Sequence, residues 1–224
     1  GDPESASISS EGHISVGPVV AQLNRGTRQA IVDMVSDGKG GVFAATASGK
    51  VLYVSAAGKI SERATLDDRV ASAIARQGKN VWYAASPGSE LWTVGAKKAR
   101  LKLKPKYVWD MMARRDTLYV ATGQPGEVHV VSGGKARKLF DAKESHVRSL
   151  AYHPQRGLLV GGGEKGIVYQ VSSKGVARAL YDSALEEVTA LSDDPITGSV
   201  FAAIVSATAK GALKPKNLDW SGQG

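Results

Sequence analysis

The sequence predicts an all-β protein, a β-propeller of four-stranded antiparallel blades with about five blades in 224 residues. Three observations predict it: a segment of about 40 residues repeats along the chain, each copy holds up to four short apolar runs, and Gly-bearing turns separate the runs. Helical solenoids have repeats of similar length, but these runs lack the 3.6-residue periodicity of amphipathic helices.

A hairpin forms the clearest part of each copy. Runs rich in Val, Leu, Tyr and Trp flank a turn that contains glycine, which is typical of a β-hairpin. The copies start at residues 42, 81, 118, 158 and 200, so successive starts are separated by 39, 37, 40 and 42 residues. The expected hairpins are 42–54, 81–94, 118–131 and 158–171, and 200–205 opens a fifth copy.

Two further strands are expected in each copy. An apolar run precedes each hairpin and should line the propeller axis; these runs are 31–34, 71–74, 108–111, 147–150 and 188–191. Another run follows each of the first four hairpins and should form the outer rim; these runs are 59–66, 99–103, 135–140 and 176–181.

The same spacing predicts the domain organisation. Residues 1–29 contain N-terminal strands, expected at 6–9, 13–16 and 19–23. Residues 30–205 hold five repeats, about 30–67, 68–105, 106–143, 144–184 and a partial 185–205, and 206–224 form a tail. One hypothesis is that the N-terminal strands pair with the partial repeat and close the ring. The alternative is that the chain is an excerpt of a longer propeller.

Composition excludes several classes of protein. The chain has 29 Lys and Arg against 21 Asp and Glu, a net charge of +8, and 42% hydrophobic residues, which rules out wholesale disorder. Cysteine is absent, so disulfide scaffolds, Cys-based zinc sites and thiol nucleophiles are excluded. No apolar run approaches the roughly 20 residues that a membrane span requires.

The positive charge concentrates on the expected outer strands. Segments 58–66, 95–104, 133–140 and 173–181 contain twelve basic residues and one acidic residue, whereas the rest of the chain has a net charge of −3. Edge protection explains this pattern, because Lys and Arg discourage edge-to-edge strand pairing. A polyanion partner is the functional alternative, although the aromatic residues do not alternate with this charge, which argues against nucleic acid. The rim residues for such binding are Arg63, Arg100, Lys102, Arg137, Lys138 and Arg178.

The sequence predicts no catalytic residue, no metal site and no cofactor. No HExxH, GxSxG, P-loop or dinucleotide motif is present. His129 is expected to be a packed or rim-facing strand residue, and His153 is expected in a solvent-exposed turn. The glycines at 161–163 are expected in a hairpin turn with no helix after them, so they do not indicate a phosphate site.

The axis offers the strongest candidate binding site. Asp33 and Asp110 should accept backbone N–H bonds near the axis, or else contribute to a polar socket for a peptide. In that socket Trp109 would be the anchor and Arg148 its charged complement, with His146 at the mouth of the axis. Only two of the ten expected inner positions are carboxylates, which is few for a cation that takes six to eight oxygen ligands.

Several segments together resemble a known family. They are 12–18, 105–109, 140–141, 144–150, 166–169, 180–183 and 187–191. In order and register, over about residues 5 to 205, they resemble bacterial WD-repeat-like propellers of deltaproteobacteria and acidobacteria. The resemblance implies the fold, a place in the cell envelope or periplasm, and a match to the N-terminal half of longer proteins. The Gly-His and Trp-Asp dipeptides of eukaryotic WD repeats are missing, so their partners do not carry over.

These observations favour a non-enzymatic scaffold that presents a loop face to a protein or peptide. The alternative is a propeller hydrolase or lyase that acts on a sugar or lactone with an axial cation. A second alternative is polyanion binding through the basic rim.

Overall fold

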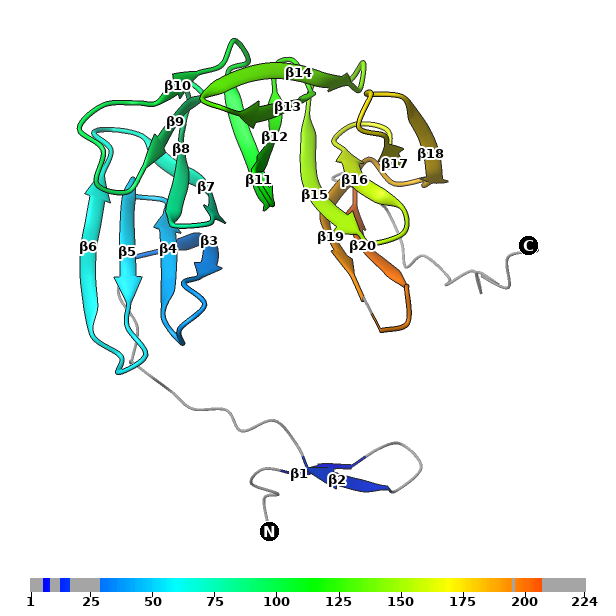
Figure 1. Cartoon of the computed structure of the whole chain (residues 1–224). Coiled ribbons are helices and arrows are strands. Elements are labelled where there is room, and N and C mark those ends of the chain that lie inside the picture. The colour runs from blue at the N-terminus through cyan, green and yellow to red at the C-terminus, as the bar shows by residue number, and fades with distance from the viewer. Residues whose placement is uncertain (1–5, 9–12, 17–28, 195, 207–224) are drawn as a thin grey trace.

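A computed structural model describes residues 6–8, 13–16, 29–194 and 196–206. These residues form 20 β-strands, and no helix occurs among them. Five sheets follow one another around an open arc, and the first strand of each sheet lies on the inner side (Figure 1). The architecture is the β-propeller that the repeat predicts, and each sheet is one blade.

Each blade is an antiparallel meander in sequence order. Blade 1 consists of β3 (Ile31–Ser36), β4 (Val42–Thr46), β5 (Lys50–Val54) and β6 (Ile60–Thr65). Blade 2 consists of β7 (Val70–Gln77), β8 (Asn80–Ser86), β9 (Glu90–Thr93) and β10 (Leu101–Lys102). Blade 3 consists of β11 (Tyr107–Arg114), β12 (Thr117–Gly123), β13 (Glu127–Ser132) and β14 (Lys135–Asp141). Blade 4 consists of β15 (Val147–His153), β16 (Gly157–Gly162), β17 (Ile167–Val171) and β18 (Ala177–Asp182).

Two smaller sheets complete the described strands. Blade 5 contains β19 (Glu187–Asp193) and β20 (Val200–Val205), which pair with each other. Near the N-terminus, β1 (Ala6–Ile8) and β2 (Ile14–Val16) form an antiparallel pair. Two of the expected N-terminal strands are thus present, while the expected strand at 19–23 lies outside the described residues.

The core lies between the blades. One cluster of buried residues joins blades 1 and 2, a second joins blades 2 and 3, and a third joins blades 3 and 4. Alternate residues of each strand point to opposite faces, so a blade contributes apolar side chains to both neighbours. Leu91, Leu118 and Leu159 are among the largest side chains that are fully buried.

Turns on one face hold adjacent segments together. The turn between the second and third strand of a blade bonds to the connection that leads to the next blade, as from Gly126 N–H to Glu144 O (3.0 Å). Gly49 adopts a φ of +80°, and a Cβ atom there would lie 2.3 Å from the carbonyl oxygen of Arg69. This face, built from second-to-third-strand turns and interblade connections, is called the connection face below.

A β-bulge recurs in the first strand of all five blades. One residue of each first strand is skipped in the pairing with the second strand. The skipped residues are Val32, Ser72, Trp109, Arg148 and Thr189. Bulges are common beside functional sites because they re-aim a side chain.

Side chains beside the bulges bond one blade to the next. Each of the four interblade junctions has such a contact between a polar side chain and a backbone group of the following blade. The contacts run from Asp33 to Ile74 (2.8 Å), Ser86 to Val108 (3.1 Å), Asp110 to Leu150 (2.7 Å) and Ser149 to Val188 (2.9 Å).

The two end blades expose apolar side chains that the central blades bury. Val32 and Met34 on β3 are 47% and 62% exposed, and Phe201 on β20 is 62% exposed. Their faces have no neighbouring blade among the described strands (Figure 1). Because the described residues contain no helix, none of them forms a helical membrane span.

Candidate functional site

Adjacent bulges bring Trp109 and Arg148 together on the connection face. Trp109 is the bulged residue of β11, and Arg148 is the bulged residue of β15 in the next blade. The Arg148 guanidinium carbon lies 4.0 Å from the centroid of the Trp109 ring, which is a cation–π contact. Both residues are partly exposed. The anchor and charged complement predicted from the sequence are therefore in direct contact.

His146 is the third member of this cluster. Nε1 of Trp109 donates a hydrogen bond of 3.0 Å to Nδ1 of His146, and the two rings meet edge to face at 5.4 Å. An indole nitrogen can only donate, so Nδ1 has no proton and the neutral imidazole carries its proton on Nε2. Burial, together with the charge of Arg148, lowers the pKa of His146 below its ordinary 6.5. The half-buried ring therefore offers a neutral N–H donor at Nε2.

Tyr107 and Glu187 extend the cluster in both directions. The Tyr107 ring stacks on Trp109 at 5.3 Å, and Nζ of Lys106 lies 5.1 Å from the Tyr107 centroid. On the other side, Nε of Arg148 donates to the carboxylate of Glu187, the first residue of β19. The cluster thus spans blades 3, 4 and 5. The five residues Tyr107, Trp109, His146, Arg148 and Glu187 are called the axial cluster below.

His146 occupies space that is open because positions 123 and 163 are glycines. A Cβ atom on Gly123 would lie 2.2 Å from Nδ1 of His146 and 2.3 Å from Nε1 of Trp109. A Cβ atom on Gly163 would lie 2.7 Å from the Cβ of His146. Any larger residue at position 123 would collide with both nitrogens of the Trp109–His146 hydrogen bond. Gly161 and Gly162 end β16 rather than forming the turn expected from the sequence.

The two axial aspartates bond to backbone, as the structural interpretation of the sequence expected. Oδ1 of Asp33 accepts from the N–H of Met34, while the other oxygen accepts from blade 2. Burial raises the pKa of Asp33, and it raises the pKa of Asp110 from 3.8 to about 6, with the charge of Asp33 adding to the effect on Asp110. These carboxylates are near enough to repel each other, and backbone N–H groups use part of their acceptor capacity.

No group of three or more His, Asp or Glu side chains in the described residues could hold a metal ion. Two surface hollows lie away from the axial cluster, at turns on the opposite face. One is lined by Arg76, Asn80 and Arg115, and the other by Tyr152 and Arg156. The axial cluster itself is built from aromatic and charged side chains.

The sequence identified three of the five cluster residues as binding candidates. Tyr107 was missed as a site residue, although its i, i+2 spacing from Trp109 on a strand is a usable signal, since such residues tend to share a face. The sequence pattern does not single out Glu187 as a partner of Arg148, because the two residues lie 39 positions apart.

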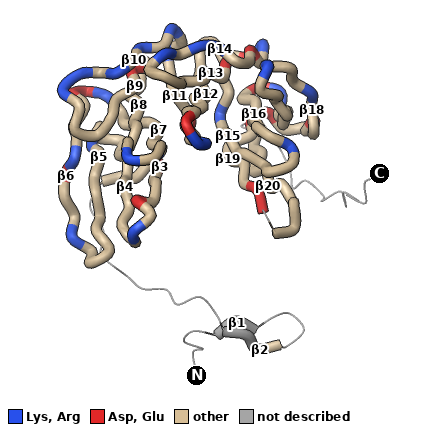
Figure 2. The backbone as a smooth tube through the Cα atoms, in the orientation of Figure 1, with Lys and Arg blue, Asp and Glu red and all other residues tan. Residues whose placement is uncertain are grey.

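Five of the six predicted basic residues lie on outer strands, and Arg100 lies immediately before β10. Figure 2 shows Lys and Arg along these strands. Several of these side chains contact partners within their own blade. Arg63 lies over the Tyr53 ring at 5.0 Å, Arg100 donates to Thr93, and Arg178 donates to Gln170. Lys102 pairs with Glu90 at 3.5 Å, Lys138 pairs with Glu127 at 2.9 Å, and Arg137 is exposed.

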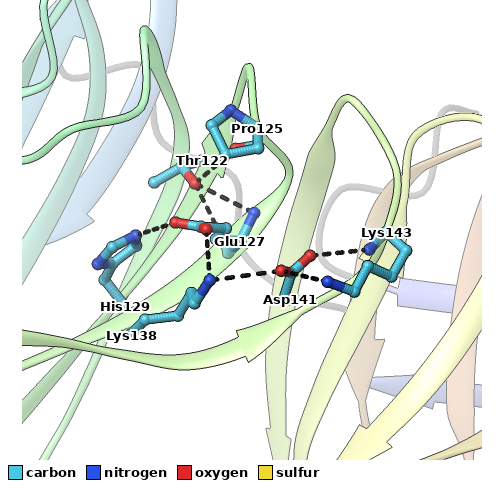
Figure 3. A network of polar contacts seen from close by, with 7 residues as sticks. All are labelled: Thr122, Pro125, Glu127, His129, Lys138, Asp141 and Lys143. Carbon is cyan, nitrogen blue, oxygen red and sulfur yellow. Dashed lines mark hydrogen bonds and ion pairs between the residues drawn. The ribbon is translucent and has the colours of Figure 1, made fainter.

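His129 belongs to a buried polar network in blade 3 (Figure 3). Its Nε2 lies 2.7 Å from Oε2 of Glu127, and both side chains are about nine-tenths buried. Oε1 of Glu127 accepts from Nζ of Lys138, which also contacts Asp141 at 3.3 Å (Figure 3). The packed position expected for His129 is confirmed, and its contacts point to a structural role.

His153 contradicts the sequence-based expectation of an exposed turn residue. Only 1% of it is exposed. Nδ1 accepts from the N–H groups of Gln155 and Arg156, so Nε2 carries the proton and donates to the carbonyl of Gly198 at 2.9 Å. Gly198 belongs to blade 5, and pattern alone does not indicate a contact 45 residues away.

Comparisons with solved structures place the chain among β-propellers. The extracellular domain of BT4673 from B. thetaiotaomicron aligns with a TM-score of 0.64 and 18% identity, covering 89% of this chain and 30% of that one. A catalytically inactive virginiamycin B lyase from Staphylococcus aureus with quinupristin aligns with a TM-score of 0.61 and 15% identity, covering 83% of this chain and 66% of that one. YCF48 bound to D1 peptide aligns with a TM-score of 0.59 and 17% identity, covering 80% of this chain and 61% of that one.

This chain therefore spans less than two thirds of each of these three proteins. No protein-family model matches the sequence. No curated protein matches it. The likeness to solved structures supports the propeller fold and does not extend to the narrower bacterial WD-repeat-like family.

Proposed function

We propose that this protein is a non-enzymatic β-propeller scaffold whose connection face binds a protein or peptide segment at the axial cluster. The observation that carries the proposal is the Trp109 ring, which is partly exposed and held in place by Tyr107, His146 and Arg148. Trp, Tyr and Arg are enriched at the energetic centres of protein interfaces. A ring that is already held loses little rotamer freedom on binding, which favours affinity.

The cluster offers distinct contacts to an extended segment. The aromatic faces of Tyr107 and Trp109 suit an apolar or aromatic side chain, and the Nε2–H of His146 suits a carbonyl or carboxylate acceptor. The charge of Arg148 is already paired with Glu187, so the site does not select strongly for anions. YCF48 bound to D1 peptide supports peptide binding as a use of this fold. The resemblance to bacterial WD-repeat-like propellers, with its envelope location, accords with such a scaffold.

Peptide-library selection on the immobilised protein tests the proposal. Peptides enriched on the wild-type protein should bind at least tenfold more weakly to Trp109→Ala and to Arg148→Ala. Arg137→Ala on the outer rim, where the side chain is exposed, is the matched control and should bind normally. Selected peptides that bind all four proteins equally would show that the axial cluster is not the binding site.

A propeller hydrolase or lyase is the second candidate, supported by the virginiamycin B lyase structure and by the two axial carboxylates. Its mechanism would need a cation near Asp33 and Asp110. Calcium titration of the parent protein and of Asp33→Ala/Asp110→Ala tests it. Tight binding that the double variant loses would favour the enzyme, whereas no heat of binding in the parent would exclude a calcium-dependent one.

Polyanion binding through the basic rim is the third candidate. Its support is the exposed Lys and Arg on the outer strands (Figure 2). Heparin titrated at 50 and at 200 mM salt tests it, because counterion release makes such binding fall steeply with salt. Edge protection alone predicts no measurable binding at either salt concentration.

A further inference from the structure

Among the described strands, blade 5 ends at β20, and this edge is apolar. Four blades contain four strands each, whereas blade 5 has two in the described residues. Phe201 on β20 corresponds to Phe43 on β4, which contacts the Tyr53 ring of the next strand at 4.7 Å. Phe201 is 62% exposed and Val205 is 47% exposed. Blade 5 therefore presents the surface that a third strand covers in the other blades.

The β20 edge lacks the protection that the other blade edges carry. Each outermost strand, β6, β10, β14 and β18, contains at least one Lys or Arg. The six residues of β20 are Val, Phe, Ala, Ala, Ile and Val, without a charge. Natural sheets protect an edge that stays free with charge, so an uncharged apolar edge indicates a strand that is normally paired.

The β1–β2 hairpin has the features of a third and fourth blade strand. Its strands are antiparallel and are joined by five residues, as are β5 with β6 and β17 with β18. The turn sequences also match. Val54-Ser-Ala-Ala-Gly58 and Val171-Ser-Ser-Lys-Gly175 follow the pattern of an aliphatic residue, Ser, two variable residues and Gly, and so does Ile8-Ser-Ser-Glu-Gly12.

The structure shows why blades 1 and 4 need this turn sequence. Oγ of Ser55 and Oγ of Ser172 each accept a hydrogen bond of 3.1 Å from the backbone N–H four residues later. Gly58 and Gly175 have φ angles of +78° and +83°, which favour glycine. The pattern thus forms the third-to-fourth-strand turn in two of the four complete blades.

We propose that the β1–β2 hairpin of this same chain completes blade 5, with β1 pairing antiparallel to β20. Two blades predict the same register. Val42 pairs with Val54 in blade 1, and Leu158 pairs with Val171 in blade 4. Each first residue corresponds to Val200, and each second residue corresponds to Ile8. Ile8 therefore lies opposite Val200, Ser7 opposite Phe201, and Ala6 opposite Ala202.

The connection to blade 1 permits this arrangement. Fourteen residues separate Val16 from Ile31, whereas the connections between successive complete blades contain four or five residues. An extended segment of that length spans up to about 46 Å. This connection therefore constrains the position of the hairpin much less than a connection of four or five residues would.

Engineered cross-linking tests the register, because the chain has no cysteine of its own. Ser7→Cys combined with Phe201→Cys should form a disulfide within one chain, since directly opposed antiparallel residues lie within disulfide range. Ser7→Cys with Ala202→Cys is the control, because those side chains point to opposite faces of the sheet and should not cross-link. A second in-register pair, Ile8→Cys with Val200→Cys, repeats the test in case the first double variant does not fold.

Each outcome decides the proposal. Disulfide-bonded monomers for both in-register pairs, with the control reduced, would support it. Disulfide-bonded dimers alone would assign the β20 edge to a second copy and overturn intrachain pairing. Reduced cysteines in both pairs, in protein that unfolds cooperatively, would also overturn it. As an independent measure, Ser7→Pro should speed hydrogen exchange at least tenfold for the β20 amides that do not donate to β19.

Discussion

The Asp110 carboxylate sits where burial and interblade bonding oppose each other. Its Oδ2 accepts the N–H of Leu150 and so links blade 3 to blade 4, yet burial raises its pKa to about 6. Asp33 makes the equivalent bond to blade 2 and adds repulsion. The bond needs an acceptor oxygen, whereas the negative charge is unfavourable at this position.

Asp110→Asn should separate these two effects. The folded pKa lies above the unfolded value of 3.8, so the wild-type native state binds more protons between pH 3.8 and about 6 and loses stability as pH rises through that window. The amide keeps an acceptor and does not titrate. We expect the free energy of unfolding of the variant to exceed that of wild type by roughly 1 to 3 kcal/mol at pH 7, and to differ little from it near pH 4.

Urea unfolding at pH 4, 5, 6 and 7 measures the difference. Asp116→Asn, in an exposed turn, controls for removal of one acidic charge. A stability difference between Asp110→Asn and wild type that is independent of pH would contradict the assigned pKa.

Gly123 makes the Trp109–His146 hydrogen bond sterically possible. Gly123→Ala should displace one of the two rings and cost roughly 1 to 3 kcal/mol, as overpacking usually does. Nitrogen NMR shifts of the His146 ring should report loss of the Nε2–H tautomer preference. The same substitution should cost much less in a Trp109→Ala/His146→Ala background. An equal cost there would trace the effect to the backbone.

The blade is the unit at the scale of elements, and its third and fourth strands are joined by side chains as well as by the backbone. In blade 3, Glu127 on β13 contacts His129 on its own strand and Lys138 on β14 (Figure 3). A buried carboxylate needs such partners, because an unpaired charge in the interior is costly. The network therefore fixes β14 against β13 at a position close to the edge.

A graded pair of substitutions at Glu127 measures this network. Glu127→Gln can still accept from His129 but loses its charge, so we expect a cost of about 1 kcal/mol. Glu127→Ala leaves a buried imidazole without this partner and should cost about 2 to 3 kcal/mol. Urea unfolding at pH 7 gives both values. Equal costs for the two variants would mean that the His129 contact contributes nothing.

Charge is segregated at the scale of the whole molecule. The outer strands carry an excess of Lys and Arg (Figure 2). The segments that form the connection face contain residues of both signs. A net charge of +8 is therefore a property of the rim and not of the candidate binding site. The same distribution leaves the apolar β20 edge as the exception among the blade edges.

Removing rim charge should promote association rather than unfolding. Arg63→Thr/Arg137→Thr/Arg178→Thr should aggregate faster by light scattering, with its urea midpoint almost unchanged, because bare strand edges pair with one another. Lys39→Thr/Lys79→Thr/Arg115→Thr, in turns, is the matched control with the same net charge. Equal aggregation of the two variants would attribute the effect to net charge alone.

Local pattern was sufficient for the fold and for part of the site. The hairpin positions and the inner strands follow from apolar runs and glycine turns, because strand pairing in this meander joins segments that are close in sequence. Trp109 and Arg148 could be selected since each lies near the start of a strand that the repeat places at the axis, and His146 immediately precedes such a strand. The burial of His153 could not be selected, because it depends on a loop of the next blade.

The sequence by itself determined the propeller blade, the repeat length of about 40 residues and the basic rim, because each depends on spacing within one repeat. Only the tertiary structure decided that Trp109 and Arg148 touch, that His146 is held neutral with a free Nε2–H, and that Glu187 neutralises Arg148. Those contacts cross from one blade to the next. The bulge recurs in each repeat, but the contacts themselves form between residues of successive repeats, so the pattern of a single repeat does not reveal them.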